Sequence, residues 1–290
     1  MTFLHFKNDL VKICLAEFFG TFLLLYFGDS GVAQTVLYEG SFLTIGITWT
    51  IGLFAAISVA AKISGAHVNP AVTICVFIFD KKFRTEKIGG FSSKIKVAAY
   101  IISQFLGAFV GAALTYLQYY NAINNEKNGF GKNGSTAGIF ATYPKPTMSI
   151  RSAFFVEFFT TAILVTMVFA CGDKNQFHGG DSKIPVGLWT MPLILLGIGQ
   201  SFGQQTGFAI NPARDLGPRV FTWMVGYPND LIWYFPEDSL YASGEYYFWI
   251  PVVAPILGAV FGGFIYQIFV GDQLSENDET ENNAENDLVH

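Results

Sequence analysis

Six long apolar stretches constrain this chain more than any other feature of its sequence. Each approaches or exceeds the length of about 20 residues that an α-helix needs to cross a hydrocarbon layer. Only 13% of the 290 residues are charged, against about 25% in ordinary soluble domains. The alternative is a large soluble helical protein, but core helices rarely stay apolar on every face over such lengths. The stretches span approximately residues 11–37, 41–61, 95–119, 150–171, 184–202 and 246–270.

Basic residues predict the orientation of these spans. Six spans place both termini on the same side, and lysine and arginine gather near the N-terminus and before the third span. By the positive-inside rule these segments are cytoplasmic, so we expect a multi-pass plasma-membrane protein with both termini inside. The first span is too long for a cleavable signal and lacks a small-residue cleavage site. The basic residues are Lys7, Lys12, Lys81, Lys82, Arg84, Lys87, Lys94 and Lys96.

The remaining charge and motif content excludes several classes of function. Residues 271–290 are acidic without lysine or arginine, so we expect a disordered cytoplasmic tail, and nothing favours nucleic-acid binding. Asn133 begins an Asn-Gly-Ser glycosylation sequon in a connection that the topology places outside. No cysteine pair has the spacing of metal ligands, and no cofactor is predicted. The cysteines are Cys14, Cys75 and Cys171.

The chain contains an internal repeat. AHVNPAV at 66–72 and FAINPAR at 208–214 share Asn-Pro-Ala, 142 positions apart. Upstream, AEFFGT at 16–21 and VEFFTT at 156–161 lie 140 positions apart. Because each half contains three spans, the second half enters the membrane from the opposite face, and the repeats are inverted.

Each Asn-Pro-Ala segment is predicted to begin a helix too short to cross the membrane. Asparagine caps exposed amides, and proline suits the first helical position because it has no N–H to lose. Only short apolar segments follow, at 72–79 and 220–225. Two half-helices would therefore enter from opposite faces and meet near the midplane with their positive N-terminal ends together.

SGAHVNPAVT and GFAINPARDLGP resemble the paired signature of the aquaporin, or major intrinsic protein, family. The resemblance implies an all-α membrane fold with six transmembrane helices and two re-entrant half-helices in an inverted 3+3 repeat. It also implies a homotetramer with one pore in each protomer. Asp215 resembles a marker of the glycerol-conducting branch. The chain is predicted to divide into an N-terminus at 1–10, a channel domain at 11–270 and the tail at 271–290. The two halves of the channel domain lie at about 11–119 and 150–270, and an extracellular loop at 120–149 joins them.

The resemblance also implies the pore residues. A selectivity constriction of Trp49, Gly199, Phe208 and Arg214 matches the glycerol-facilitator pattern. Two aromatic side chains would contact the carbon edge of glycerol, and the arginine would donate hydrogen bonds to its hydroxyls. The motif residues are Asn69, Pro70, Ala71, Asn211, Pro212 and Ala213. Further pore-lining residues are Gly65, Ala66, His67, Gly207 and Ala209, and the glutamates Glu17 and Glu157 would support the loops.

The function implied is a passive channel for glycerol, other small neutral solutes and water that excludes protons and ions. No nucleophile with a base, metal set or nucleotide loop suggests an enzyme. A water-selective channel stays open as an alternative, although such channels usually carry histidine where Gly199 stands. A coupled secondary transporter would need a titrating group in the membrane, and only Glu17 and Glu157 could serve. No role is predicted for Asp29, Gln204 or Gln205.

Overall fold

The computed structural model describes residues 6–125, 131–132, 134–173, 188–233 and 246–274, and its regular elements in these ranges are helices. Several predictions lie outside the described residues. They are the asparagine of the sequon, Asn133, and most of the predicted tail, 275–290.

Five of the six predicted spans are confirmed as helices long and apolar enough to cross a membrane. For the remaining span, helix α10 is described from Thr190 to Phe202, and 184–187 lie outside the described residues. The five long helices are α1 (Asp9–Leu37), α2 (Phe42–Ser64), α5 (Ser93–Gln118), α8 (Ile150–Gly172) and α13 (Ile250–Tyr266), the last continued by the π-helical turn η2 (Gln267–Gly271).

Two short helices begin within the Asn-Pro-Ala segments, as predicted. Helix α3 (Pro70–Phe79) and helix α11 (Pro212–Met224) each begin at the proline. The preceding asparagine caps each helix. The side-chain oxygen of Asn69 accepts a hydrogen bond from the N–H of residue 71, and the side-chain oxygen of Asn211 accepts from the N–H groups of residues 213 and 214. Helix α11 is longer than the apolar segment 220–225, because its first half carries charged residues that pair with each other.

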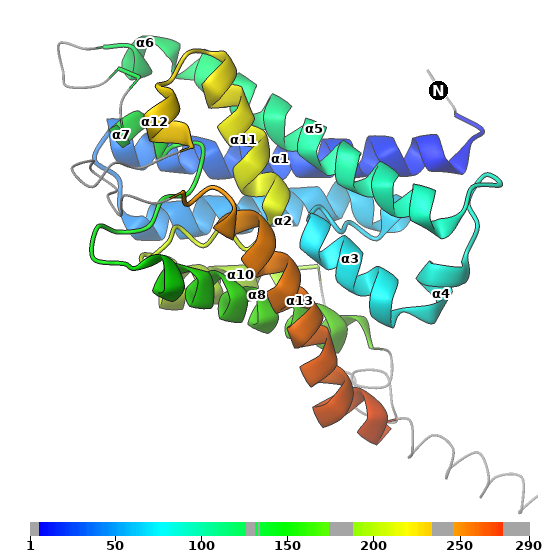
Figure 1. Ribbon diagram of the computed structural model, residues 1–290. Coiled ribbons are helices and arrows are strands. Elements are labelled where there is room, and N and C mark those ends of the chain that lie inside the picture. Colours follow the sequence, from blue (N-terminus) through cyan, green and yellow to red (C-terminus); the bar gives the residue numbers. More distant parts are fainter. Residues whose placement is uncertain (1–5, 126–130, 133, 174–187, 234–245, 275–290) are drawn as a thin grey trace, which may run out of the picture.

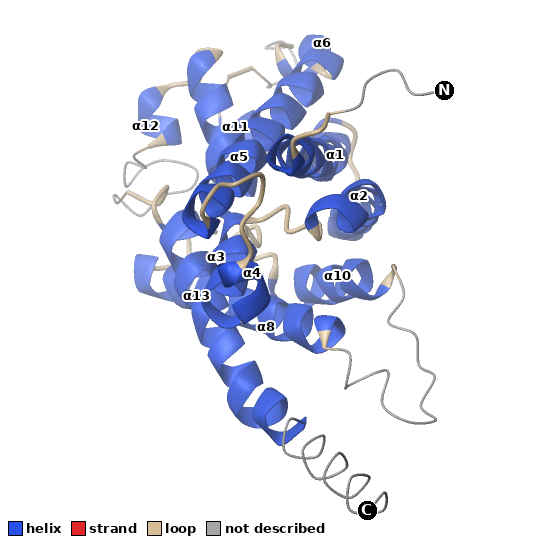
Figure 2. Cartoon of the chain, turned by 90° about the vertical axis from the view of Figure 1, so that its right-hand side faces the viewer, coloured by secondary structure: helices blue, strands red, loops and turns tan. Residues whose placement is uncertain are grey.

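The packing of the helices follows the internal repeat. Helix α5 packs on α1 in the first half, and α13 packs on α8 in the second. Each half-helix packs against the last span of the other half, α11 against α5 and α3 against α13, while α2 lies beside α10. Figure 1 shows the half-helices between the longer helices, and the end view in Figure 2 places α3 near the middle of the bundle. The two halves are therefore interlocked rather than side by side.

Glycines allow the long helices of each half to approach closely. A Cβ at Gly107 of α5 would clash with the Phe18 carbonyl oxygen of α1. The same contact recurs in the second half, where a Cβ at Gly258 of α13 would clash with the Phe158 carbonyl of α8. Glycine at these positions lets the membrane helices approach backbone to backbone.

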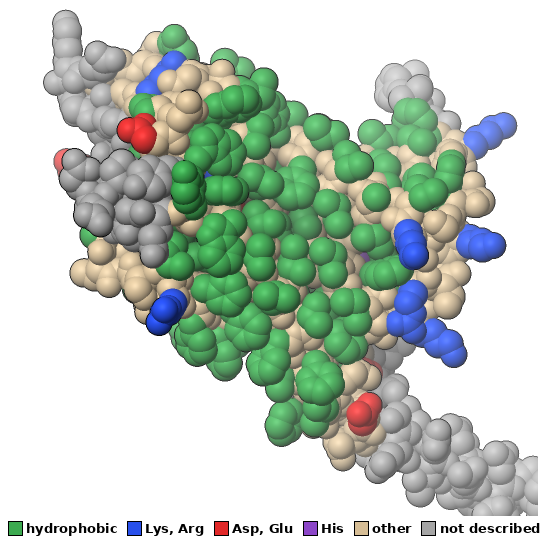
Figure 3. Space-filling model, in the orientation of Figure 1, with side chains coloured by type: hydrophobic (Ala, Val, Ile, Leu, Met, Phe, Trp, Pro, Cys, Tyr) green, Lys and Arg blue, Asp and Glu red, His purple; other side chains and the backbone are tan. Residues whose placement is uncertain are grey.

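The surface is divided along the bundle. Hydrophobic side chains cover the middle, and lysine and arginine gather at the end that carries the N-terminus and the short helix α4 (Lys81–Thr85) (Figure 3). The opposite end carries the short helices α6 (Tyr120–Ile123), α7 (Gly134–Ala137) and α12 (Asn229–Ile232). Lys96 is an exception among these basic residues, because its side chain is buried. Its Nζ lies 2.8 Å from the Glu86 carboxylate. An apolar band between two polar ends fits a bilayer-spanning protein.

Candidate functional site

The loops that precede the two half-helices have the same unusual backbone. Gly65 and Gly207 both have a φ of +86°, in the left-handed region that favours glycine. Positive φ, which strains a residue with a side chain, recurs at two further positions of each loop. These residues are Ala66 (52°) and Val68 (43°) in the first loop and Phe208 (40°) and Ile210 (44°) in the second. All three pairs lie 142 positions apart, so the duplication extends to single dihedral angles.

Glu17 of α1 accepts hydrogen bonds from the first loop. Its Oε1 accepts from the His67 N–H at 3.0 Å, and its Oε2 accepts from the Val68 N–H at 2.8 Å. Gln104 Nε2 and the Ser64 hydroxyl donate to the same carboxylate at 2.7 and 2.5 Å. The carboxylate is fully buried and meets four donors. Gln104 was not predicted as a partner of Glu17, although an amide within an otherwise apolar span indicates a polar contact.

Glu157 of α8 occupies the equivalent place in the second half. Its two carboxylate oxygens accept from the Ala209 N–H at 3.0 Å and the Ile210 N–H at 2.8 Å. It is fully buried as well. In each half, therefore, a carboxylate from the first span holds two successive N–H groups of a strained loop.

The two loops are joined through their asparagines. Asn69 Nδ2 donates to the Ile210 carbonyl at 2.9 Å, and Asn211 Nδ2 donates to the Val68 carbonyl at 2.8 Å. Each amide nitrogen carries two hydrogens, so one remains on each asparagine beyond this contact. Because both side-chain oxygens cap their own helices, the positive ends of α3 and α11 are held facing each other.

The four predicted constriction residues come together in space. The ring centroids of Trp49 and Phe208 are 6.4 Å apart with an interplanar angle of 75°. The Arg214 guanidinium carbon lies 4.3 Å from the centre of the Trp49 ring. A Cβ added at Gly199 would lie 3.4 Å from the Phe208 ring. Two aromatic side chains and a guanidinium therefore lie together, with Gly199 on the side of the Phe208 ring.

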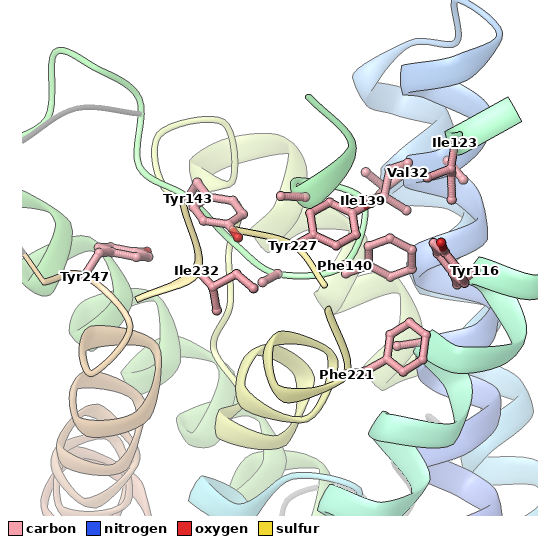
Figure 4. Packing of buried hydrophobic residues seen from close by; sticks show 14 of the residues in the cluster. Val32, Tyr116, Ile123, Ile139, Phe140, Tyr143, Phe221, Tyr227, Ile232 and Tyr247 are labelled. Atoms are coloured by element: carbon pink, nitrogen blue, oxygen red, sulfur yellow. The ribbon is translucent and has the colours of Figure 1, made fainter. Parts of the chain in front are cut away.

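Arg214 is held by the segment that precedes α8. Its Nη1 donates to the Phe140 carbonyl at 2.9 Å. The Phe140 side chain is fully buried in a cluster with Tyr116, Phe221 and Tyr227, which fixes this segment (Figure 4). The guanidinium is thus placed by a rigid backbone carbonyl and keeps further N–H groups for other acceptors.

Asp215, the predicted branch marker, does not face the constriction. Its Oδ2 accepts from the Thr142 N–H at 2.7 Å, and its Oδ1 accepts from Arg219 Nε at 2.8 Å. Arg219 Nη2 also donates to the Thr142 carbonyl at 2.7 Å. This fully buried ion pair ties the segment that holds Arg214 to α11. Arg219 was not predicted as the partner of Asp215, although a spacing of four residues places the two side chains on one face of a helix.

A cavity of about 700 Å³ extends from the constriction toward Asp80, at the end where α4 lies. Three constriction residues line it, namely Trp49, Phe208 and Arg214. Of the other predicted pore residues, Gly65, Ala66, His67, Asn69, Ala209 and Asn211 also line it. Gly199 and Gly207 are not among its lining residues, and Gln204 and Gln205 are exposed near the end of α10.

Comparisons with known proteins cover nearly the whole chain. Residues 5–266 match the family model described as Major intrinsic protein. Aquaglyceroporin-2 of Rhizophagus irregularis is 42% identical over 258 residues, which cover 87% of this chain and 74% of the relative. An aquaporin of Laccaria bicolor is 39% identical over 276 residues, covering 94% and 97% of the two chains. The X-ray structure of the aquaglyceroporin from Plasmodium falciparum aligns with a TM-score of 0.74 at 31% identity, covering 92% of this chain and 99% of that one.

Proposed function

The chain belongs to the major intrinsic protein family, and from this premise we propose that it is a passive channel for glycerol, other small neutral solutes and water. Relatives about 40% identical are named aquaporins and aquaglyceroporins. The chain is a multi-pass membrane protein with the family's all-helical fold, and it is not an enzyme.

The residues of the constriction are the main reason for proposing glycerol as a permeant. Glycerol has one edge of hydroxyl groups and one of CH groups. Trp49 and Phe208 meet edge to face and offer an apolar corner to the carbon edge. Arg214, held by a backbone carbonyl through one N–H, offers its remaining donors to the hydroxyls. A channel that binds both edges at once selects for small polyols of this shape.

The loops and half-helices would conduct the permeant and exclude ions. The second amide hydrogens of Asn69 and Asn211 would donate to a passing oxygen atom. The positive ends of α3 and α11, with Arg214, would repel protons and cations. Residues Gly65, Ala66, His67, Gly207, Phe208 and Ala209 would supply the pore lining, an accepted use of irregular backbone at membrane depth. Glu17 and Glu157 would keep both loops in place.

A water-selective channel would need a narrower constriction. At Gly199 the absence of a side chain leaves room beside the Phe208 ring, which a Cβ would already contact at 3.4 Å. A larger residue there would reduce the space for the carbon backbone of glycerol but leave a path for water. The glycine therefore favours the glycerol channel over this alternative.

A coupled transporter would need a group whose occupancy changes during the cycle. Both candidate glutamates are engaged by the loops, Glu17 with four donors and Glu157 with two loop amides. Glycerol uptake into proteoliposomes, measured with and without a pH or sodium gradient, tests the distinction. We expect equal rates and equal final concentrations, and accumulation above the external concentration would contradict the channel.

We place the channel in the plasma membrane with both termini in the cytoplasm, because lysine and arginine gather at the end that carries the N-terminus (Figure 3). Asn133 then faces the outside. We expect a homotetramer with a pore in each protomer, which the mass of the purified protein in detergent measures directly. We also propose Asp215 as a marker of the glycerol-conducting branch, on the resemblance of GFAINPARDLGP to that branch, while its hydrogen bond to Thr142 has a structural role.

A further inference from the structure

Asp29 is a buried carboxyl side chain beside the constriction that the proposed function does not use. It lies in α1, is fully buried, and neither of its carboxylate oxygens has a hydrogen-bond partner among the described residues. Its Oδ1 lies 3.9 Å from Arg214 Nη1, which is longer than a hydrogen bond but within the range of an ion pair. A buried carboxylate without an opposite charge is strongly destabilised. Arg214 is therefore the group that stabilises a charge at this position.

The neighbouring residue of α1 supports the apolar wall of the constriction. Gly28 packs so closely on Trp49 that a Cβ would lie 2.5 Å from the indole ring. Two successive residues of α1 thus contact two different walls, Gly28 the aromatic wall and Asp29 the guanidinium.

The internal repeat shows that this charged pair is not part of the common scaffold. Asp29 corresponds to Phe169 at the offset of 140, and Arg214 corresponds to Val72 at the offset of 142. Val72 and Phe169 belong to one apolar cluster. Both pairs join one half of the chain to the other, but one pair lies in an apolar cluster and the other is the ion pair at the constriction.

The buried carboxylates around Arg214 have different partners. Asp215 pairs with Arg219 at 2.8 Å, and both are fully buried. Glu157 also acts on Arg214, but its two oxygens accept from loop amides. Asp29 has no such partner among the described residues and is the carboxylate within ion-pair distance of Arg214. Without Asp29, Arg214 would lose this opposite charge beside the path of the permeant.

We propose that Asp29 is a specificity-determining residue that acts through Arg214, as the counter-ion that offsets part of the arginine's charge at the constriction. Arg214 and the positive ends of α3 and α11 still repel cations, but the weakened positive field attracts small anions less, so the channel favours neutral solutes over them. The consequence for permeation rests on the proposed channel function, whereas the pairing itself can be tested without any flux.

The pairing is tested by the stability of the purified full-length protein in detergent. Arg214→Met keeps an unbranched side chain but leaves Asp29 without its counter-ion, so it should lower the melting temperature. Adding Asp29→Asn should restore about half or more of the loss, since both charges are then absent. Further destabilisation by the second substitution would overturn the proposal.

The role in specificity is tested by the ratio of nitrate to glycerol permeability in proteoliposomes. Asp29→Asn should raise this ratio about tenfold, which corresponds to about 1.4 kcal/mol. Ser30→Ala is the matched control, because Ser30 is on the same turn with a buried hydroxyl and no charge, and it should keep the wild-type ratio. A merely structural role would lower both permeabilities together and leave their ratio unchanged, which would overturn the proposal. Absence of glycerol flux in the wild type would contradict the proposed function, while the stability test would still decide the pairing.

Discussion

Replacing Glu157 by glutamine tests whether the buried carboxylates stabilise the pore loops. The two oxygens accept from different backbone amides, Ala209 at 3.0 Å and Ile210 at 2.8 Å. Glutamine keeps the size of the side chain but turns an NH2 group toward one of these N–H groups, whichever way its amide is oriented. One buried N–H then loses its acceptor and stays unsatisfied, which costs about 1–3 kcal/mol, and the remaining hydrogen bond goes to a neutral instead of a charged acceptor. We expect these effects together to cost about 3 kcal/mol.

Backbone strain in the same loop determines where the variant opens first. Phe208 and Ile210 have φ values of 40° and 44°, and such conformations cost about 1–3 kcal/mol each. The bonds to Glu157 oppose the release of this strain, so the variant should unfold first at this loop.

Glu17→Gln should destabilise less. Ser64 and Gln104 both donate to Glu17, and a hydroxyl that rotates or an amide that turns can accept from the new NH2 group. Glu39→Gln is the matched control, because Glu39 is exposed and the same chemical change there should leave the free energy of unfolding unchanged.

Thermal unfolding of the purified variants in detergent, followed by circular dichroism, measures these differences. A loss of about 3 kcal/mol corresponds to roughly 6–12 °C in melting temperature for a chain of this size. The reasoning is refuted if Glu157→Gln melts with the wild type and instead changes the pH dependence of glycerol flux, as a proton relay would.

Three further predictions concern packing and selectivity. Gly199→His should reduce glycerol flux far more than water flux in proteoliposomes, since each 1.4 kcal/mol of steric barrier costs about tenfold in rate; an unchanged ratio would remove Gly199 from the constriction. Gly258→Ala should lower the melting temperature because its Cβ would clash with a backbone carbonyl of α8, whereas Gly197→Ala, with open space around its Cβ, should not. Asp215→Ala should destabilise the protein by about 3–5 kcal/mol in denaturant titrations, because it leaves Arg219 buried without its partner; wild-type stability would show that the pair is not structural.

Most of the architecture could be predicted because the internal repeat can be recognised in the sequence. Long apolar stretches predict spans, and Asn-Pro at a fixed offset predicts two capped half-helices. The start of α11 at Pro212 was predicted, but the ion pair between Asp215 and Arg219 inside this helix was not, because charged residues interrupt the apolar pattern.

Contacts between distant helices could not be predicted in the same way. Spacing within one span does not indicate that Gln104 donates to Glu17, 87 positions away, or that Asp29 lies 3.9 Å from Arg214. Such partners depend on how the helices cross and on which face each residue occupies. A polar residue in an apolar span indicates that a partner exists, but only the packed structure identifies it.

Stopped-flow light scattering on proteoliposomes tests the central claim, that the constriction conducts glycerol as well as water. Vesicles mixed with an impermeant sugar should shrink and stay small, because only water leaves. Vesicles mixed with glycerol at the same osmolarity should shrink and then swell again as glycerol enters, faster than protein-free vesicles do. Rapid shrinkage in both solutions with no protein-dependent swelling in glycerol would contradict the account and identify a water-selective channel.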